Sequence, residues 1–125
     1  MAQTTNSETL KNRTKHFALL VIRLCRSVPR SEESRIITRQ LLRSATSVAA
    51  NYRSACRARS RNEFIAKIGV VLEGADETLL WLELIVAAKM LSAARVDPLL
   101  KEADELVAIM AATRKSAITR RKSTI

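Results

Sequence analysis

The chain has 125 residues and a net charge of +10, and 47% of its residues are hydrophobic but only 3% are aromatic. With only two glycines and two prolines, this composition favours a single compact domain of long helices. No run approaches the ~18 apolar residues that a membrane span needs. The first residues also lack the apolar segment of a signal peptide, so we expect a cytoplasmic protein rather than a membrane or secreted one.

The positive charge is unevenly distributed along the chain. Residues 1–31 and 32–61 each carry a net charge of +5, residues 62–96 carry −2 and residues 97–125 carry +2. A positive field of this size favours polyanions, such as nucleic acid, an acidic protein or an anionic membrane. Plain solubility is the alternative explanation for the same excess.

The first helix is predicted over residues 8–28. Apolar or small residues recur there in alternating steps of four and three, which places them on one helical face. Ser7 is the expected N-cap, and Pro29 follows the end of the helix. The apolar stripe consists of Leu10, Thr14, Phe17, Val21, Leu24 and Val28.

A second helix is predicted over residues 32–58, with Glu32 and Glu33 in a first turn that suits carboxylates. Its stripe consists of Ile37, Leu41, Ser44, Val48, Asn51, Ala55 and Ala58. Asn51 therefore lies on the apolar stripe, not opposite it. Either this amide fixes the register of packed helices, as single buried polar residues do in coiled coils, or it is a hydrogen-bonded core amide with no special role.

A third helix is predicted over residues 61–91, because Ser60 and Glu63 have the spacing of a capping box. Its stripe consists of Ile65, Ile68, Leu72, Ala75, Leu79, Leu82 and Val86. Gly69 and Gly74 lie inside this helix, either tolerated there or placed where another helix approaches closely. The apolar surface is widened beyond one seam by Leu80, Trp81 and Leu84. A monomeric bundle would not need that width.

The fourth helix is predicted over residues 98–118, because Asp97 and Pro98 match an N-cap followed by proline at the first helical position. Residues 119–125 are expected to form a frayed basic tail. Four long helices joined by short loops predict an all-α, up-down antiparallel four-helix bundle. We expect a single domain over residues 1–125.

Few residues suit catalysis or metal binding. His16 is the only histidine and is expected at the surface, while Cys25 and Cys56 have no CxxC partner and are expected to be small buried residues. The clustered carboxylates lack the Glu-x-x-His pairs of di-metal bundles, so we expect them to be solvated or paired with arginines. They are Glu73, Asp76, Glu77 and Glu83. We therefore expect no enzyme activity, no cofactor and no metal.

Arginines follow helical spacing along the second predicted helix. Arg35, Arg39 and Arg43 are each four residues apart, and Arg53 and Arg57 repeat that spacing. Arginine binds phosphate bidentately, but no aromatic platform or groove-reading motif accompanies it, which predicts low sequence specificity. The candidate nucleic-acid-binding residues are Arg39, Arg43, Arg53, Arg57, Arg59, Arg61, Arg120, Arg121 and Lys122.

The stretch LRSATSVAANYRSACRARSRNEFIAKIGVVLEGADETLLWLEL, residues 42–84, resembles bacterial four-helix-bundle proteins encoded inside intervening sequences of large-subunit ribosomal RNA genes. The family pattern falls on Ser47, Ala50, Asn51, Arg59, Ser60, Glu63 and Phe64, and its later acidic part on Asp76, Glu77, Trp81 and Glu83. Many members carry Glu-Gly shortly after the asparagine, where this chain has Ser54 and Ala55. A role of that glutamate therefore does not transfer.

The resemblance implies a bundle that assembles as a homopentamer. It also implies kinship with the accessory protein of diversity-generating retroelements, a basic pentameric bundle that binds nucleic acid and its reverse transcriptase. Fold and assembly follow from such a resemblance more directly than function does.

Two functions from different classes remain open. The protein binds nucleic acid, with RNA favoured over DNA, or it is an interaction scaffold whose basic surface docks an acidic protein partner. A cationic face serves both. In either case we expect a homo-oligomer with no membrane partner, and the residues expected to shape its packing are Asn51, Ser47, Ala50, Leu80, Trp81 and Leu84.

Overall fold

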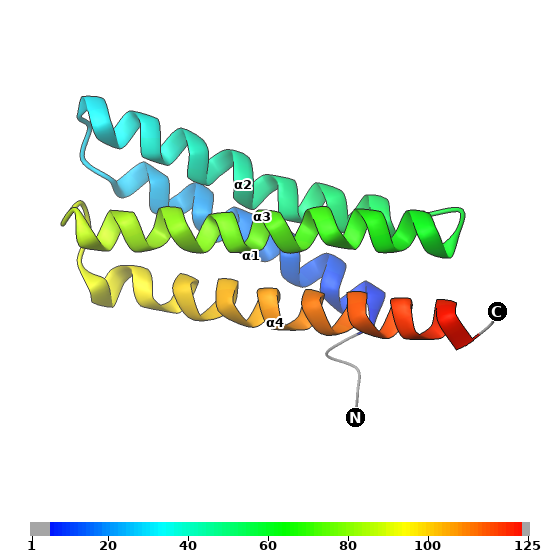
Figure 1. The fold of residues 1–125 in the computed structure, drawn as a ribbon. Helices are drawn as coiled ribbons and strands as arrows, with labels where there is room; N and C mark the ends of the chain where they lie inside the picture. Colours follow the sequence, from blue (N-terminus) through cyan, green and yellow to red (C-terminus); the bar gives the residue numbers. More distant parts are fainter. Residues whose placement is uncertain (1–5, 124–125) are drawn as a thin grey trace.

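The structure is a computed structural model that describes residues 6–123. Its helices are α1 (Ser7–Ser27), α2 (Glu32–Cys56), α3 (Arg61–Ala87) and α4 (Ala93–Ser123), and no strand occurs among the described residues. Consecutive helices pack against one another. The α1–α2 and α3–α4 turns lie at one end of the molecule and the α2–α3 turn at the other (Figure 1). The prediction of an all-α four-helix bundle is confirmed.

Side-chain caps fix where α1 and α2 begin. Asn6, in extended conformation, accepts a hydrogen bond of 2.8 Å from the backbone N–H of Thr9. Asn6 is therefore the N-cap, and the prediction of Ser7 was wrong by one residue. At α2 the Ser31 hydroxyl accepts from the Ser34 N–H (3.0 Å) while the Ser34 hydroxyl accepts from the Ser31 N–H (2.8 Å). This reciprocal pair satisfies two backbone donors that a helix start leaves open.

The α2–α3 turn starts earlier than predicted. Helix α2 ends at Cys56 rather than at residue 58, because the N–H of Arg57 bonds to the Ser54 carbonyl at 3.0 Å and tightens the last turn.

Of the two hydrogen bonds in the capping box predicted at the start of α3, one is present. Ser60 accepts from the Glu63 N–H at 3.0 Å, but the Glu63 carboxylate accepts from the N–H of Arg59, at 2.9 Å, and not from Ser60.

Helix α3 ends at Ala87, whereas the sequence pattern extended to residue 91. The N–H of Met90 bonds to the Ile85 carbonyl (2.9 Å), and the N–H of Lys89 bonds to the Val86 carbonyl (3.0 Å). Lys89 adopts the left-handed conformation with φ of 60°. This is the hydrogen-bond pattern of a Schellman motif, and it gave no sequence signal because lysine stands where glycine is usual.

Helix α4 begins at Ala93, so the predicted start at Asp97 and Pro98 was wrong. The Ser92 hydroxyl accepts from the Arg95 N–H at 3.3 Å and provides the earlier cap. Pro98 lies inside the helix on an exposed surface, where water can bond the carbonyl that a proline leaves without a donor. Asp97 instead pairs with Lys101 at 3.1 Å.

The C-terminal basic segment is helical and not frayed up to Ser123. The Arg121 guanidinium donates a 3.0 Å hydrogen bond to the Asn62 side-chain oxygen and so ties the end of α4 to the start of α3. The prediction of a frayed tail is therefore wrong for residues 119–123, and residues 124–125 lie outside the described residues.

The predicted core stripe holds for α1 and is shifted in α3. All six predicted residues of the first stripe are buried. In α3 the predicted Leu72 and Leu79 are only half-buried, whereas the unpredicted Val71, Thr78 and Ile85 are buried. The shift arises because α3 packs against both α2 and α4, so its buried face points between the two neighbours.

The two glycines of α3 have different surroundings. A Cβ at Gly74 would lie 3.2 Å from the Val48 Cγ2 atom and 3.5 Å from the Ser44 carbonyl oxygen of α2. A Cβ at Gly69 would meet only the Arg114 side chain, at 3.4 Å. Gly74 therefore marks a close approach of α2 and α3, while Gly69 is merely tolerated.

This difference predicts opposite effects of the same substitution. Gly69→Ala should raise the free energy of unfolding by about 0.5–1 kcal/mol, because alanine is the better helix former and the arginine can move. Gly74→Ala should lower it by about 1 kcal/mol, because the buried Val48 is held in one rotamer and the helices must separate. Urea denaturation of both variants checks this. Equal gains at the two positions would show that the α2–α3 contact is not tight.

Candidate nucleic-acid interface

Arg13 forms an ion pair that links two helices. Its guanidinium binds both carboxylate oxygens of Glu102, at 2.7 and 2.9 Å, and also binds Glu105. The hydrogen bond to Glu102 is the largest cause that raises the pKa of Arg13 above its ordinary value. This contact joins α1 to α4 and neutralises Arg13. No sequence pattern pointed to this contact, because the partners are about ninety residues apart.

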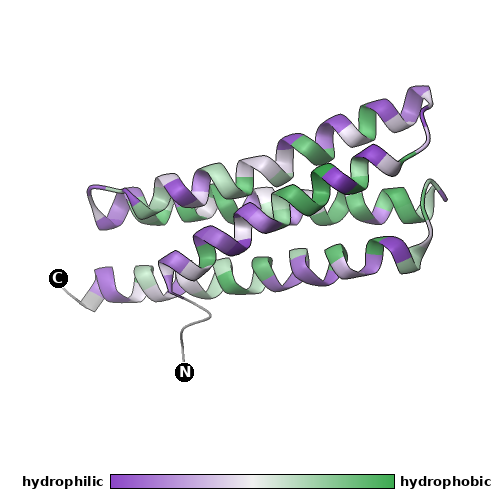
Figure 2. Cartoon of the chain, turned by 180° about the vertical axis from the view of Figure 1, so that it is seen from behind, coloured by the Kyte–Doolittle hydropathy of each residue, from purple (hydrophilic) through white to green (hydrophobic). Residues whose placement is uncertain are grey.

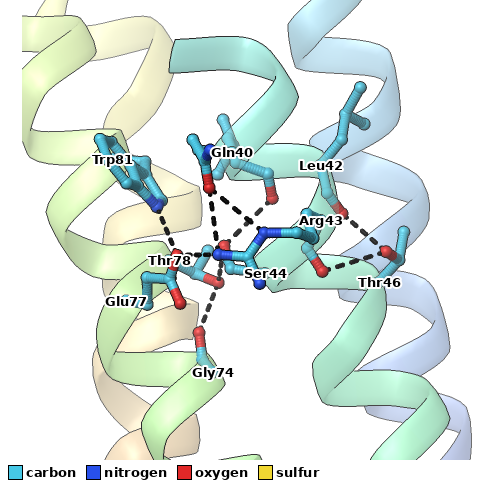
Figure 3. Close-up of polar contacts among 10 residues, drawn as sticks. Gln40, Leu42, Arg43, Ser44, Thr46, Gly74, Glu77, Thr78 and Trp81 are labelled. Atoms are coloured by element: carbon cyan, nitrogen blue, oxygen red, sulfur yellow. Dashed lines mark hydrogen bonds and ion pairs between the residues drawn. The ribbon is translucent and has the colours of Figure 1, made fainter. Parts of the chain in front are cut away.

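Arg43, a predicted nucleic-acid contact, also has a carboxylate partner. Its guanidinium lies 2.6 Å from the Glu77 carboxylate and donates to the Gln40 side-chain oxygen at 3.0 Å. The same Glu77 oxygen accepts a 3.0 Å hydrogen bond from the Trp81 indole N–H (Figure 3). The expectation that the α3 carboxylates pair with arginines is thus met at Glu77. The Glu77 carboxylate therefore partly neutralises the charge of Arg43 within the bundle.

A basic groove of about 730 Å³ lies over the outer face of α2. Three predicted arginines line it, namely Arg53, Arg57 and Arg59. Three lysines that sequence reasoning missed join them, Lys11 and Lys15 from α1 and Lys67 from α3. Only the tertiary structure brings these lysines to α2, since they are far from it in the sequence.

A second groove of about 580 Å³ lies at the α1–α2 turn. The predicted Arg39 lines it together with Arg35, Arg26 and Arg30. The spacing of Arg35, Arg39 and Arg43 suggested one continuous row. The structure divides that row, because Arg43 turns toward Glu77 on α3.

The remaining predicted cations lie beside the α2–α3 turn. Arg61 and Arg120 line a smaller hollow together with Phe64, while Arg121 bonds to Asn62. Lys122 is exposed. The nine candidate residues therefore do not form one patch but fall into separate groups at the two grooves, the α2–α3 surface and the end of α4.

Asn51 is half-buried, and its side-chain amide bonds within its own helix. The side-chain amide donates to the Ser47 carbonyl oxygen at 3.0 Å and to the Ser47 hydroxyl at 2.9 Å. Ala50 beside it is exposed. Within one chain the amide thus bridges no helices, so a role in register would require a second copy.

Helix α3 carries apolar side chains on its outer surface. Leu80 is 47% exposed, Val70 45% and Leu84 36%, while Trp81 is half-buried. Burying such side chains stabilises by about 1.5–3 kcal/mol each when fully covered. The apolar surface of the bundle therefore extends beyond its own core, as the sequence predicted.

A family model for the 23S rRNA-intervening sequence protein matches residues 8–112. The chain belongs to this family. A solved structure from Bacteroides thetaiotaomicron, a protein of unknown function from the S23 ribosomal protein family, is 28% identical with a TM-score of 0.78. The match covers 84% of this chain and 97% of that chain. No curated protein matches. The family resemblance seen in the sequence is confirmed.

No group of metal-ligating side chains is present in this family member among residues 6–123. Over the same range, none of its helices has an apolar stretch long enough to cross a bilayer. Both cysteines are half-buried free thiols, so they are less buried than predicted. Burial raises the pKa of the Cys25 thiol from 9.0 to about 11.

The raised pKa predicts slow alkylation of Cys25 in the folded protein. At a pH near 9 only a small fraction of this thiol is ionised, so iodoacetamide should modify it tens of times more slowly than in urea. The free energy of unfolding should also fall as pH rises between about 9 and about 11, because the unfolded thiol loses its proton first. Peptide mass spectrometry measures the first effect, and Cys25→Ser should remove its part of the second. Equal rates with and without urea would show that the thiol is not desolvated.

Proposed function

We propose that this family member is a non-catalytic RNA-binding protein of the cytoplasm, built from an up-down antiparallel bundle. The observation that supports it best is the basic groove over α2, to which α1, α2, α3 and the turn contribute six cations. Arg13 and Arg43 are occupied by carboxylates within the bundle. Among residues 6–123, Lys11 is the one groove cation that forms an ion pair with a carboxylate. The charge of the other groove cations is therefore available to phosphate groups.

Binding of this kind depends on charge and reads little sequence. Tyr52, the only aromatic residue in α2, is 3% exposed, and no aromatic side chain is among the described residues that line the basic groove. The groove therefore offers no platform on which bases stack. Phosphate contacts alone position a nucleic acid without specifying its sequence, so RNA and DNA both bind and RNA is favoured by the kinship of the family with ribosomal RNA genes.

A closed homo-oligomer, with five copies by family resemblance, forms part of this proposal. The exposed Leu80 and Leu84 beside the half-buried Trp81 provide apolar surface that a second copy would cover. Small residues on α2, such as Ser47 and Ala50, permit close approach of another helix, and Asn51 would fix the register. A ring multiplies the positive field by the number of copies.

An interaction scaffold is the second candidate function. The same cations would attract an acidic protein partner, such as a nucleic-acid enzyme, and the net charge of +10 favours either ligand. Direct binding to RNA separates the two functions.

Charge reversal on the outer face of α2 tests RNA binding. Arg53→Glu with Arg57→Glu should weaken binding to all RNA sequences about equally, and should flatten the dependence of log K on log salt by about 0.7 for each lost phosphate contact. Electrophoretic titration at two salt concentrations measures both effects. The control, Arg95→Glu with Lys115→Glu, makes the same charge change on α4. An unmodified protein that fails to bind RNA at low salt would favour the scaffold.

Polar substitution on the outer face of α3 tests assembly. Leu80→Glu with Leu84→Glu should convert the oligomer to monomers, because the charges would be buried without partners. Light scattering at micromolar concentration measures the mass. Leu19→Glu is the control, since Leu19 is 41% exposed on α1, a helix that packs against α2 and α4. A monomeric unmodified protein would contradict the proposed assembly.

A further inference from the structure

The floor of the basic groove is formed by small side chains on the outer face of α2. Ala49 and Ala50 lie there beside Thr46 and Ser54. The Thr46 hydroxyl donates to the Leu42 carbonyl at 2.7 Å, within its own helix, so it does not project a free donor. These side chains are short and uncharged, so they leave room between the longer side chains around them.

The long side chains around this floor are all cationic except one. Lys11 and Lys15 stand on α1, Lys67 stands on α3, and arginines come from α2 and the turn. The visible face of α1 is hydrophilic over its first half when the molecule is seen from behind (Figure 2). The exception is Glu63, whose carboxylate is engaged by the backbone N–H of Arg59 at 2.9 Å.

Apart from Lys11, these cations lack carboxylate partners within the described chain. Lys11 alone has an ion pair, with the exposed Glu8 at 3.4 Å, and exposed pairs of this type contribute little. Lys15 and Lys67 have none among residues 6–123, although Lys67 is half-buried. Cations that line one groove without counter-charges create a positive field that favours a bound anion.

We infer that this groove holds the phosphate backbone of an RNA strand, with Lys11, Lys15 and Lys67 as phosphate contacts beside the arginines of α2. The inference rests on the proposed RNA binding and assigns it to one groove. The second groove is the weaker candidate, because Glu32 and Glu33 occupy the first turn of α2 beside its arginines. No aromatic side chain lines the groove over α2, so bases are not held and sequence is not read.

A comparison of two triple variants tests this assignment. Lys11→Gln, Lys15→Gln and Lys67→Gln neutralise the three lysines of the groove. Arg95→Gln, Lys101→Gln and Lys115→Gln remove the same charge from exposed positions on α4, none of which lines the groove. The probe is a fluorescent single-stranded RNA of about 12 nucleotides and mixed sequence, within the usual range of site sizes. Anisotropy titrations at several salt concentrations give the affinity and the salt slope, and circular dichroism and light scattering verify fold and mass.

The groove variant should bind about tenfold or more weakly at low salt, and its salt slope should fall by about 2, at about 0.7 for each of three contacts. The α4 variant should change the slope by less than half of that. Equal losses in the two variants would overturn the assignment, since binding would then follow net charge, while RNA binding itself would stand. Failure of the unmodified protein to bind the RNA would overturn both the assignment and the proposed function.

Discussion

The close contact between α2 and α3 is the constraint on which the arrangement of the bundle depends. The two helices approach closely at Gly74, where the absence of a side chain admits Val48 and the backbone of Ser44. One turn further along α3, the Thr78 hydroxyl lies 2.9 Å from the Ser44 hydroxyl in the buried interface (Figure 3). A slip of either helix would break this buried interhelical hydrogen bond, whereas each hydroxyl would keep the carbonyl partner in its own helix.

The packing of the helices also determines which arginines are available to a ligand. The packing of α2 on α3 brings Arg43 to Glu77, and the packing of α1 on α4 brings Arg13 to Glu102 and Glu105. Among residues 6–123, no carboxylate forms an ion pair with Arg53, Arg57 or Arg59, so these arginines keep their charge. The 22 lysine and arginine side chains thus include some that are neutralised between helices and others that face solvent without a counter-charge, and the second group can attract a polyanion.

Apart from Lys67, the groove cations and the apolar side chains of the proposed assembly lie on different elements, and Ala50 on α2 belongs to both proposed surfaces. The apolar side chains exposed on α3 lie around Leu80, whereas the groove cations lie over α2 and α1. A ring closed through α3 would therefore leave room for a basic surface that repeats in every copy. Membership of the 23S rRNA-intervening sequence family agrees with a bundle of this kind and leaves the role of the basic surface to experiment.

The sequence by itself determined the four helices, the core face of α1, the family and the excess of positive charge. Hydrophobic periodicity and caps are local, so they can be read from neighbouring residues. The C-terminal end of α3 could not be predicted, because a lysine occupies the left-handed position at residue 89. The start of α4 could not be predicted either, because Ser92 caps the helix ahead of Pro98. The candidate site was predicted in part: Arg53, Arg57 and Arg59 share the groove, while Arg43 does not line it. Only the tertiary structure decided this, because ion pairs and grooves join side chains from separate helices whose relative positions depend on packing.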